Sequence, residues 1–283
     1  MIQIMRETGW AKINLALHVR ARRADGYHDL ETIFAFVSQG DDISVERSDN
    51  DRLMINGEFA IGLDAGESNL VMQAVHRIRF ATYEDRVPPL AIRLTKNLPV
   101  GAGIGGGSAD AAAMARLIRD HFLPDLSDLQ LQAILSPLGA DIAACIPSQT
   151  CFGQGTGATL RPARDYQTCG TPILLVNPRQ IVSTGPVFQA WDQQDRGALI
   201  WGQGWKSDLL AARNDLLHPA LSQCPEISDI LRVLKELKPW LVRMSGSGAT
   251  CFALFSCVED RDAAARHLAQ YHPQWWQMAG ELR

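Results

Sequence analysis

The chain has 283 residues, of which 46% are hydrophobic and 20% are charged, and its formal net charge is −4. This length favours two domains, and the negative charge argues against non-specific nucleic-acid binding, which requires a basic surface patch. No apolar run reaches the ~18 residues that a membrane-spanning helix needs, and the N-terminus lacks the apolar region of a secretory signal. We therefore expect a cytoplasmic protein whose six cysteines are reduced.

The first predicted strand spans residues 10–19. Its alternation places every second residue from Ala11 to Leu17 on one, apolar face, and Lys12 and Asn14 on the opposite face. A lysine on such a face is ordinarily solvated. Further along the chain, residues 30–37 and 42–47 are predicted to pair as two strands around Gly40.

A basic loop, residues 20–28, follows the first strand and contains an Asp-Gly turn. Its three arginines are either solvated or available to an anionic substrate. Beyond residue 47, a polar segment leads to Ser68, which is placed to cap a helix over residues 69–83.

Residues 99–113 concentrate the candidate chemistry, because five glycines fall within residues 101–107. The pattern predicts a strand over residues 90–95 before this tract and a helix over residues 109–121 after it. A glycine loop that opens a helix presents backbone amides to a phosphate. The alternative is a flexible surface turn, but a turn needs only one or two glycines, fewer than this tract contains.

Two known phosphate loops fit this tract poorly. The Walker A loop requires a lysine that is absent here. Gly101, Gly103 and Gly106 have the spacing of the dinucleotide fingerprint, but the acidic residues at the expected distance, Asp125 and Asp128, lie in a predicted turn and helix start. A nicotinamide-dependent oxidoreductase therefore remains an alternative.

A helix is predicted over residues 126–135, and the second half of the chain follows it. Asp141 comes after a Gly-Ala pair and is, by default, a helix cap. A second glycine tract near residue 155 suggests a domain boundary, which gives domains 1–155 and 156–283. Further expectations are a strand at 173–177, an exposed loop at 192–205, a helix at 225–237, a strand–turn–strand unit at 241–255 and a helix at 259–271.

Residues 99–109 resemble the second motif of the GHMP kinases, a superfamily that includes galactokinase, homoserine kinase and mevalonate kinase. The proline, the glycine spacing and the serine agree, and Ile104 stands at the usual leucine. Residues 244–248 resemble the third motif of the same superfamily. The resemblance implies an α+β fold with an N-terminal ribosomal-S5-like domain, a C-terminal ferredoxin-like domain and an active site between them.

Two stretches narrow the resemblance from the superfamily to one family within it. The segment Ala11-Lys-Ile-Asn-Leu15, followed by Arg22-Arg-Ala-Asp-Gly-Tyr-His28, is similar to the 4-diphosphocytidyl-2-C-methyl-D-erythritol kinases of the non-mevalonate isoprenoid pathway. Asp141 lies in a segment similar to that family's Leu-Gly-Ala-Asp, although Ala143 replaces its usual proline. Another GHMP kinase acting on mevalonate or homoserine, and a non-catalytic nucleotide-binding regulator, remain as alternatives.

The resemblance implies phosphoryl transfer from ATP, with Mg²⁺, to the 2-hydroxyl of a cytidyl diphosphate sugar alcohol, by a monomer or weak homodimer. It implies that Lys12 and Asp141 are catalytic and that Ser108 can reach the metal. Tyr27 and Phe188 would sandwich the cytosine, and His28 would bind its edge. The implied ATP-binding residues are Asn69, Lys96, Pro99, Val100, Gly101, Ala102, Gly103, Ile104, Gly105, Gly106, Gly107, Ser108 and Ala109. The implied substrate-binding residues are Asn14, Tyr27, His28, Thr184, Phe188, Gly246 and Gly248.

Overall fold

The computed structural model describes residues 4–82 and 86–283. The chain forms two compact units that are interleaved along the sequence. The first unit comprises Met1–Ala11, Gly40–Val100 and Gly105–Ser148, and the second unit comprises Lys12–Gln39, Gly101–Ile104 and Gln149–Arg283. Because the chain passes between the units several times, the division into residues 1–155 and 156–283 stays a prediction.

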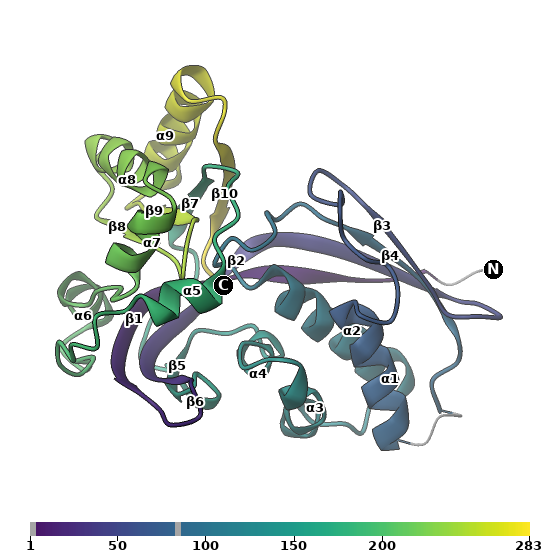
Figure 1. Ribbon diagram of the computed structural model, residues 1–283. Coiled ribbons are helices and arrows are strands. Elements are labelled where there is room, and N and C mark those ends of the chain that lie inside the picture. The colour runs from purple at the N-terminus through teal and green to yellow at the C-terminus, as the bar shows by residue number, and fades with distance from the viewer. Residues whose placement is uncertain (1–3, 83–85) are drawn as a thin grey trace. The chain divides into compact units, whose positions relative to one another are not determined.

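The first unit combines strands with a group of helices. Residues 42–47 of β2 (His28–Arg47) pair antiparallel with β4 (Leu90–Thr95), and β4 pairs parallel with β3 (Arg52–Asn56). Figure 1 shows α1 and α2 packed side by side, and the alanines that dominate the buried face of α2 allow this close approach. The helices of this unit are α1 (Leu70–Thr82), α2 (Gly106–Phe122), α3 (Asp128–Leu135) and α4 (Ile142–Cys145).

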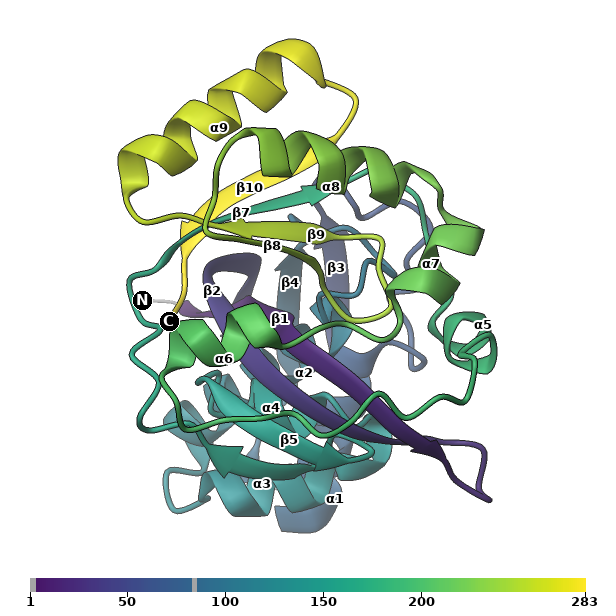
Figure 2. The same cartoon turned by 90° about the vertical axis from the view of Figure 1, so that its left-hand side faces the viewer.

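The second unit is built on an antiparallel sheet with the strand order β10-β7-β9-β8. Two helices cover one face of this sheet, as Figure 2 shows for α8 and α9. The apolar stripe of α8 reaches the core through Ile227, Ile230 and Leu234. The elements are β7 (Pro172–Asn177), β8 (Leu241–Met244), β9 (Cys251–Leu254), β10 (Trp276–Glu281), α8 (Glu226–Glu236) and α9 (Val258–Tyr271).

Other elements of the second unit lie outside this sheet. Residues 30–34 of β2 pair antiparallel with β5 (Cys151–Gly155), which pairs in turn with β6 (Thr159–Pro162). The second glycine tract therefore forms the end of β5 and the turn into β6. Three short helices were not predicted from the sequence: α5 (Thr184–Gln189), α6 (Trp205–Ala211) and α7 (Leu217–Gln223).

Gly40 corrects the predicted pairing of residues 30–37 with residues 42–47. The two segments are parts of one continuous strand, β2, so no turn interrupts them. A Cβ on Gly40 would lie 2.7 Å from the carbonyl carbon of Gly9, which is shorter than any tolerated contact. Gly40 thus permits a close approach of two backbones, which is the other common reason for a glycine within a strand.

The first strand, β1 (Met5–Arg22), also differs from its prediction. Residues 11–19 are buried on both faces, so the expected polar face does not meet solvent. Lys12 is only 3% exposed. The interpretation of Lys12 as an ordinary solvated lysine is therefore wrong.

The start of α1 is a second correction. The side-chain oxygen of Asn69 accepts a hydrogen bond of 2.9 Å from the N–H of Val71, so Asn69 caps this helix. Ser68 instead donates its hydroxyl to Asp64. The predicted end of this helix at Tyr83 lies outside the described residues.

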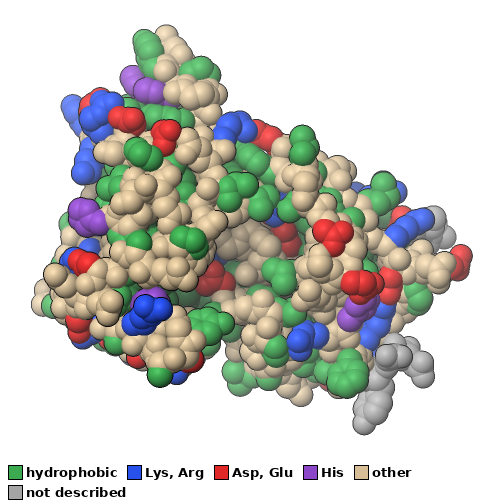
Figure 3. Space-filling model, in the orientation of Figure 1, with side chains coloured by type: hydrophobic (Ala, Val, Ile, Leu, Met, Phe, Trp, Pro, Cys, Tyr) green, Lys and Arg blue, Asp and Glu red, His purple; other side chains and the backbone are tan. Residues whose placement is uncertain are grey.

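The surface agrees with the weak net charge. On the face drawn in Figure 3, acidic and basic side chains of the described residues are interspersed. Within residues 4–82 and 86–283, no helix combines the length and the apolar character that a bilayer crossing requires.

Candidate functional site

The glycine loop adopts a backbone that side-chain-bearing residues rarely tolerate. Gly103 and Gly105 have φ angles of 73° and 64°, in the left-handed region. Gly105 is the N-cap of α2, and no described side chain caps this helix. The first amides of α2 therefore have no side-chain cap, and a phosphate is the ligand that a helix N-terminus favours.

Within the second unit, three segments that are far apart in sequence converge. The backbone N–H of Lys12 donates to the carbonyl of Ile104 at 3.0 Å. The hydroxyl of Ser245 donates to the carbonyl of Gly103 at 2.8 Å and accepts from the N–H of Asn14 at 3.1 Å. The strand that carries Lys12, the start of the glycine loop and the turn at residues 244–248 thus form one hydrogen-bonded group.

The Lys12 side chain is held by a chain of hydrogen bonds. Its ammonium donates to Asn14 Oδ1 at 3.1 Å and lies 5.3 Å from the centroid of the Phe34 ring. The Asn14 amide donates to the Thr32 hydroxyl at 2.7 Å, which in turn donates to the carbonyl of Ala16 at 2.6 Å. A lysine fixed in this way is a positioned cation rather than a mobile surface charge.

The turn at residues 244–248 approaches the loop so closely that its glycines are required. A Cβ on Gly103 would lie 2.5 Å from the carbonyl oxygen of Ser245 and 2.8 Å from that of Gly248. A Cβ on Gly246 would lie 2.9 Å from the carbonyl oxygen of Gly103. Thr184 lies beside the same turn, since its hydroxyl is 3.0 Å from that of Ser247.

Two of the predicted nucleoside residues, His28 and Phe188, lie together in the second unit. The His28 and Phe188 rings are 5.1 Å apart, and Trp191 meets the His28 ring edge-on at 5.7 Å. Tyr27 is 64% exposed, so its ring is not used for core packing. Burial, together with the positive charge of Arg22, lowers the pKa of His28 below its usual 6.5. His28 is thus neutral at pH 7, with one donor and one acceptor nitrogen.

Asp141 lies in the first unit, directly before α4. Among the described residues, its carboxylate accepts no capping hydrogen bond from α4, and its backbone is helical rather than extended. The cap interpretation of Asp141 therefore has no structural support. The segment around Asp141 lies near the glycine loop, because a Cβ on Gly139 would be 4.0 Å from the Ser108 hydroxyl oxygen.

Two other predicted ATP-binding residues have internal partners. The Lys96 ammonium donates to Asp110 Oδ2 at 2.7 Å and to Asp41. The Asn69 amide caps α1 and donates to the carbonyl of Asp64 at 2.7 Å. Their contact with ATP stays a prediction.

The basic loop uses two of its arginines for ion pairs within the second unit. Arg20 pairs with Asp195 and with Glu31, at 2.8 Å and 3.0 Å. Arg23 pairs with Asp29 at 2.9 Å. The Arg20–Asp195 ion pair also links the basic loop to residues 192–205, the predicted exposed loop. This loop is largely irregular, but Leu199 within it is buried.

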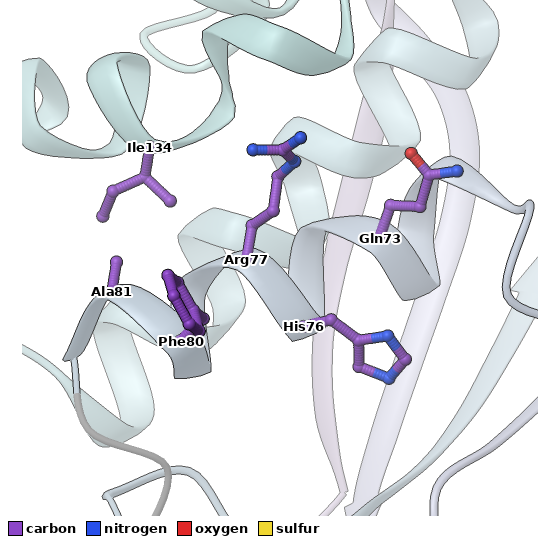
Figure 4. Close-up of a pocket in the computed structure, with 6 residues that line it drawn as sticks. All are labelled: Gln73, His76, Arg77, Phe80, Ala81 and Ile134. Carbon is purple, nitrogen blue, oxygen red and sulfur yellow. The ribbon is translucent and has the colours of Figure 1, made fainter.

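A groove of about 440 Å³ lies along the outer side of α1 in the first unit (Figure 4). It is lined by Gln73, His76, Arg77, Phe80, Ala81 and Ile134. None of the residues predicted for the site lines this groove, so the candidate chemistry lies elsewhere.

The comparisons with known proteins concern the chain as a whole. The family model of the GHMP kinase N-terminal domain matches residues 69–149, and that of the C-terminal domain matches residues 204–274. The 4-diphosphocytidyl-2-C-methyl-D-erythritol kinase of Sphingopyxis alaskensis is 62% identical over 283 residues, which cover 100% of both chains. The chain belongs to this kinase family. The resemblance seen in the sequence motifs is thereby confirmed.

Solved structures share the fold of this chain. A crystal structure of 4-(cytidine 5'-diphospho)-2C-methyl-D-erythritol kinase is 29% identical, with a TM-score of 0.82, and covers 98% of this chain and 99% of that chain. The homoserine kinase from Cytophaga hutchinsonii is 14% identical, with a TM-score of 0.70, over 99% of this chain and 95% of that chain. At that identity it shares the fold alone. The two-domain α+β GHMP kinase fold expected from the sequence is confirmed.

Proposed function

We propose that this chain transfers the γ-phosphoryl group of ATP to the 2-hydroxyl of 4-diphosphocytidyl-2-C-methyl-D-erythritol, in the non-mevalonate route to isoprenoid precursors. The observation that carries the proposal is the 62% identity to a kinase of that name over the entire length. In the reaction, a bond forms between the hydroxyl oxygen and the γ-phosphorus, and the bond from the γ-phosphorus to ADP breaks.

The nucleoside residues support a cytidyl acceptor. A neutral imidazole offers one hydrogen-bond donor and one acceptor, which suits the edge of cytosine because that edge also presents both. Phe188 lies 5.1 Å from His28, and the exposed Tyr27 is available as a second stacking surface. Mevalonate and homoserine have no base that would use such residues.

We assign the proton transfer to Asp141, whose carboxylate accepts the proton of the 2-hydroxyl as the phosphorus–oxygen bond forms. Lys12 is assigned the stabilisation of the negative charge that develops on the reacting groups. Its fixed ammonium supports this role, because a cation that is already positioned needs no reorganisation during the reaction. The amides at the start of α2 hold the ATP phosphates, and positioning of this kind provides most of the catalysis in phosphoryl transfer.

The donor set fits Mg²⁺, which usually takes one or two protein oxygens and completes its shell with phosphates and water. Within the described residues, no three His, Cys, Asp or Glu side chains cluster as a metal site. The half-buried Ser108 hydroxyl in the first turn of α2 would be the protein ligand. When bound, the ion would neutralise charge on the phosphate oxygens.

An acceptor panel tests the proposal. ADP release is measured with ATP and Mg²⁺ in the presence of 4-diphosphocytidyl-2-C-methyl-D-erythritol, mevalonate or homoserine, with NAD reduction as a control for oxidoreductase activity. Of the three acceptors, we expect only the cytidyl substrate to cause ADP release. Faster turnover of mevalonate or homoserine would contradict the proposal. We further expect a cytoplasmic monomer or weak homodimer, and sedimentation velocity measures the oligomeric state.

A further inference from the structure

A buried charged cluster lies in the first unit and has no role in the reaction as assigned above. It consists of Asp41, Lys96 and Asp110, hereafter the Asp–Lys–Asp cluster. Their side chains are 0%, 4% and 4% exposed. Removing a charge from water costs several kcal/mol even after relaxation, so such a cluster is not explained by stability alone.

The cluster contacts the chain on the side where it enters the glycine loop. Asp41 Oδ1 accepts hydrogen bonds from the backbone N–H groups of Asn97 at 2.6 Å and Leu98 at 2.9 Å. The Asn97 side chain donates to the carbonyl of Gly40 at 3.0 Å. Asp41 thus fixes the backbone immediately before Pro99, where the loop begins.

The same cluster contacts the chain where it leaves the loop. Asp110 lies near the start of α2, and Lys96 Nζ joins it to Asp41. A Cβ on Gly106, the first residue of α2, would lie 3.4 Å from Lys96 Nζ, so the ammonium lies against the exit of the loop. One set of side chains therefore holds both ends of the loop.

We propose that the Asp–Lys–Asp cluster is a clamp that fixes both ends of the phosphate loop, and that Lys96 acts through the loop rather than by contact with ATP. A glycine-rich loop loses much conformational entropy when it is ordered, and that loss weakens ligand binding. A loop whose ends are already fixed loses less on binding. This inference rests on the proposed function of the loop as the ATP site.

The charge of the cluster is consistent with a phosphate nearby. Burial raises the pKa of Asp110 well above its usual range, although the ammonium of Lys96 opposes this effect. Within the described part of the chain, Asp110 Oδ1 has no hydrogen-bond partner, and a Cβ on Gly9 would lie 2.6 Å from it. Burial thus favours the neutral form of Asp110, and that form leaves the cluster with less negative charge.

Substitution of each member tests the clamp. If an unclamped loop holds its binding conformation about a tenth of the time, the apparent Kd rises about tenfold. We expect Asp41→Ala and Lys96→Met each to raise the KM for ATP and the Kd for ADP about tenfold, and to change the KM for the cytidyl acceptor less than about twofold. Asp41→Asn keeps an oxygen for Asn97 and Leu98, and we expect it to recover part of the loss.

The alternative, direct contact of Lys96 with ATP, gives a different pattern. Asp41→Ala would then release the ammonium towards the nucleotide, and the KM for ATP would stay unchanged or fall. That result would overturn the clamp. The Kd for ADP, measured by titration calorimetry, needs no turnover, so it tests the clamp even if the acceptor panel contradicts the proposed reaction.

A matched control separates the clamp from general loosening of the first unit. Asp51 is partly buried, with its side chain 22% exposed, pairs with Arg79 at 2.9 Å and accepts from the N–H of Leu90 at 2.8 Å. Asp51→Ala removes an aspartate that, like Asp41, both forms an ion pair and accepts from a backbone N–H in the same unit. We expect a lower melting temperature with an unchanged KM for ATP. If Asp51→Ala raises that KM as much as Asp41→Ala does, the clamp is wrong.

Discussion

Alanine at position 103 tests the packing of the glycine loop against the turn at residues 244–248. The φ angle of 73° costs an L-residue about 1–2 kcal/mol. The new Cβ would lie 2.5 Å from the carbonyl oxygen of Ser245 and 2.9 Å from the amide nitrogen of Gly248. These are backbone atoms, so relieving the contact moves the turn and costs about 1–3 kcal/mol more. We expect Gly103→Ala to lower the free energy of unfolding by about 2–5 kcal/mol in total.

The matched control is Gly170→Ala, also in the second unit. Gly170 has a φ of 80°, and a Cβ there would meet no described atom within 4 Å. It therefore reports the cost of the φ angle alone, about 1–2 kcal/mol. Urea unfolding measures both variants, and initial rates give the KM for ATP. The reasoning is refuted if Gly103→Ala is no less stable than Gly170→Ala and keeps the wild-type KM.

Three further predictions concern the proposed roles. We expect Asp141→Asn to lower kcat by about 10²–10⁴ while the KM for ATP stays nearly unchanged, because the loss belongs to the transition state; a cooler-melting but fully active variant would restore the cap interpretation. Phe188→Ala should weaken acceptor binding by about 1–3 kcal/mol, which calorimetry detects, and an effect on ATP affinity instead would misplace this residue. The lowered pKa of His28 predicts a KM for the acceptor that is flat at pH 7 and rises as the pH falls below 6.5, because protonation removes the acceptor nitrogen; the same rise in His28→Ala would contradict this.

The elements around the glycine loop could be predicted from the sequence because local preferences and packing agree there. The strand at residues 90–95 has the predicted bounds, and the helix after the loop starts only three residues early, at Gly106. For β1, the alternation of residues wrongly predicted a face that meets solvent. In a strand that is buried on both faces, each polar residue needs a partner inside the protein. Lys12 and Asn14 satisfy this requirement through each other and Thr32. Such pairing depends on neighbouring strands and cannot be read from one strand.

Gly40 and the Asp–Lys–Asp cluster show a second limit. A glycine between two strand-like segments is equally compatible with a turn and with a close contact between two backbones. Only the position of Gly9 in the structure decides between them. Asp41 is far in sequence from Lys96 and Asp110, and no spacing rule joins the three. The one available signal was that Lys96 and Asp110 flank the glycine tract. Ser245 was missed for the same reason, since its partners Asn14 and Gly103 come from distant segments.

The position of the transferred phosphate tests the central claim most directly. A hydroxyl on C2 of a 2-C-methyl sugar alcohol is attached to a carbon that bears no hydrogen. We predict that ³¹P NMR of the product made from ATP and 4-diphosphocytidyl-2-C-methyl-D-erythritol shows one new phosphomonoester resonance without three-bond coupling to a proton, in an amount equal to the ADP released. A new resonance split by carbon-bound protons would place the phosphate on another hydroxyl. That result, or ADP release with no new phosphomonoester, would contradict the account.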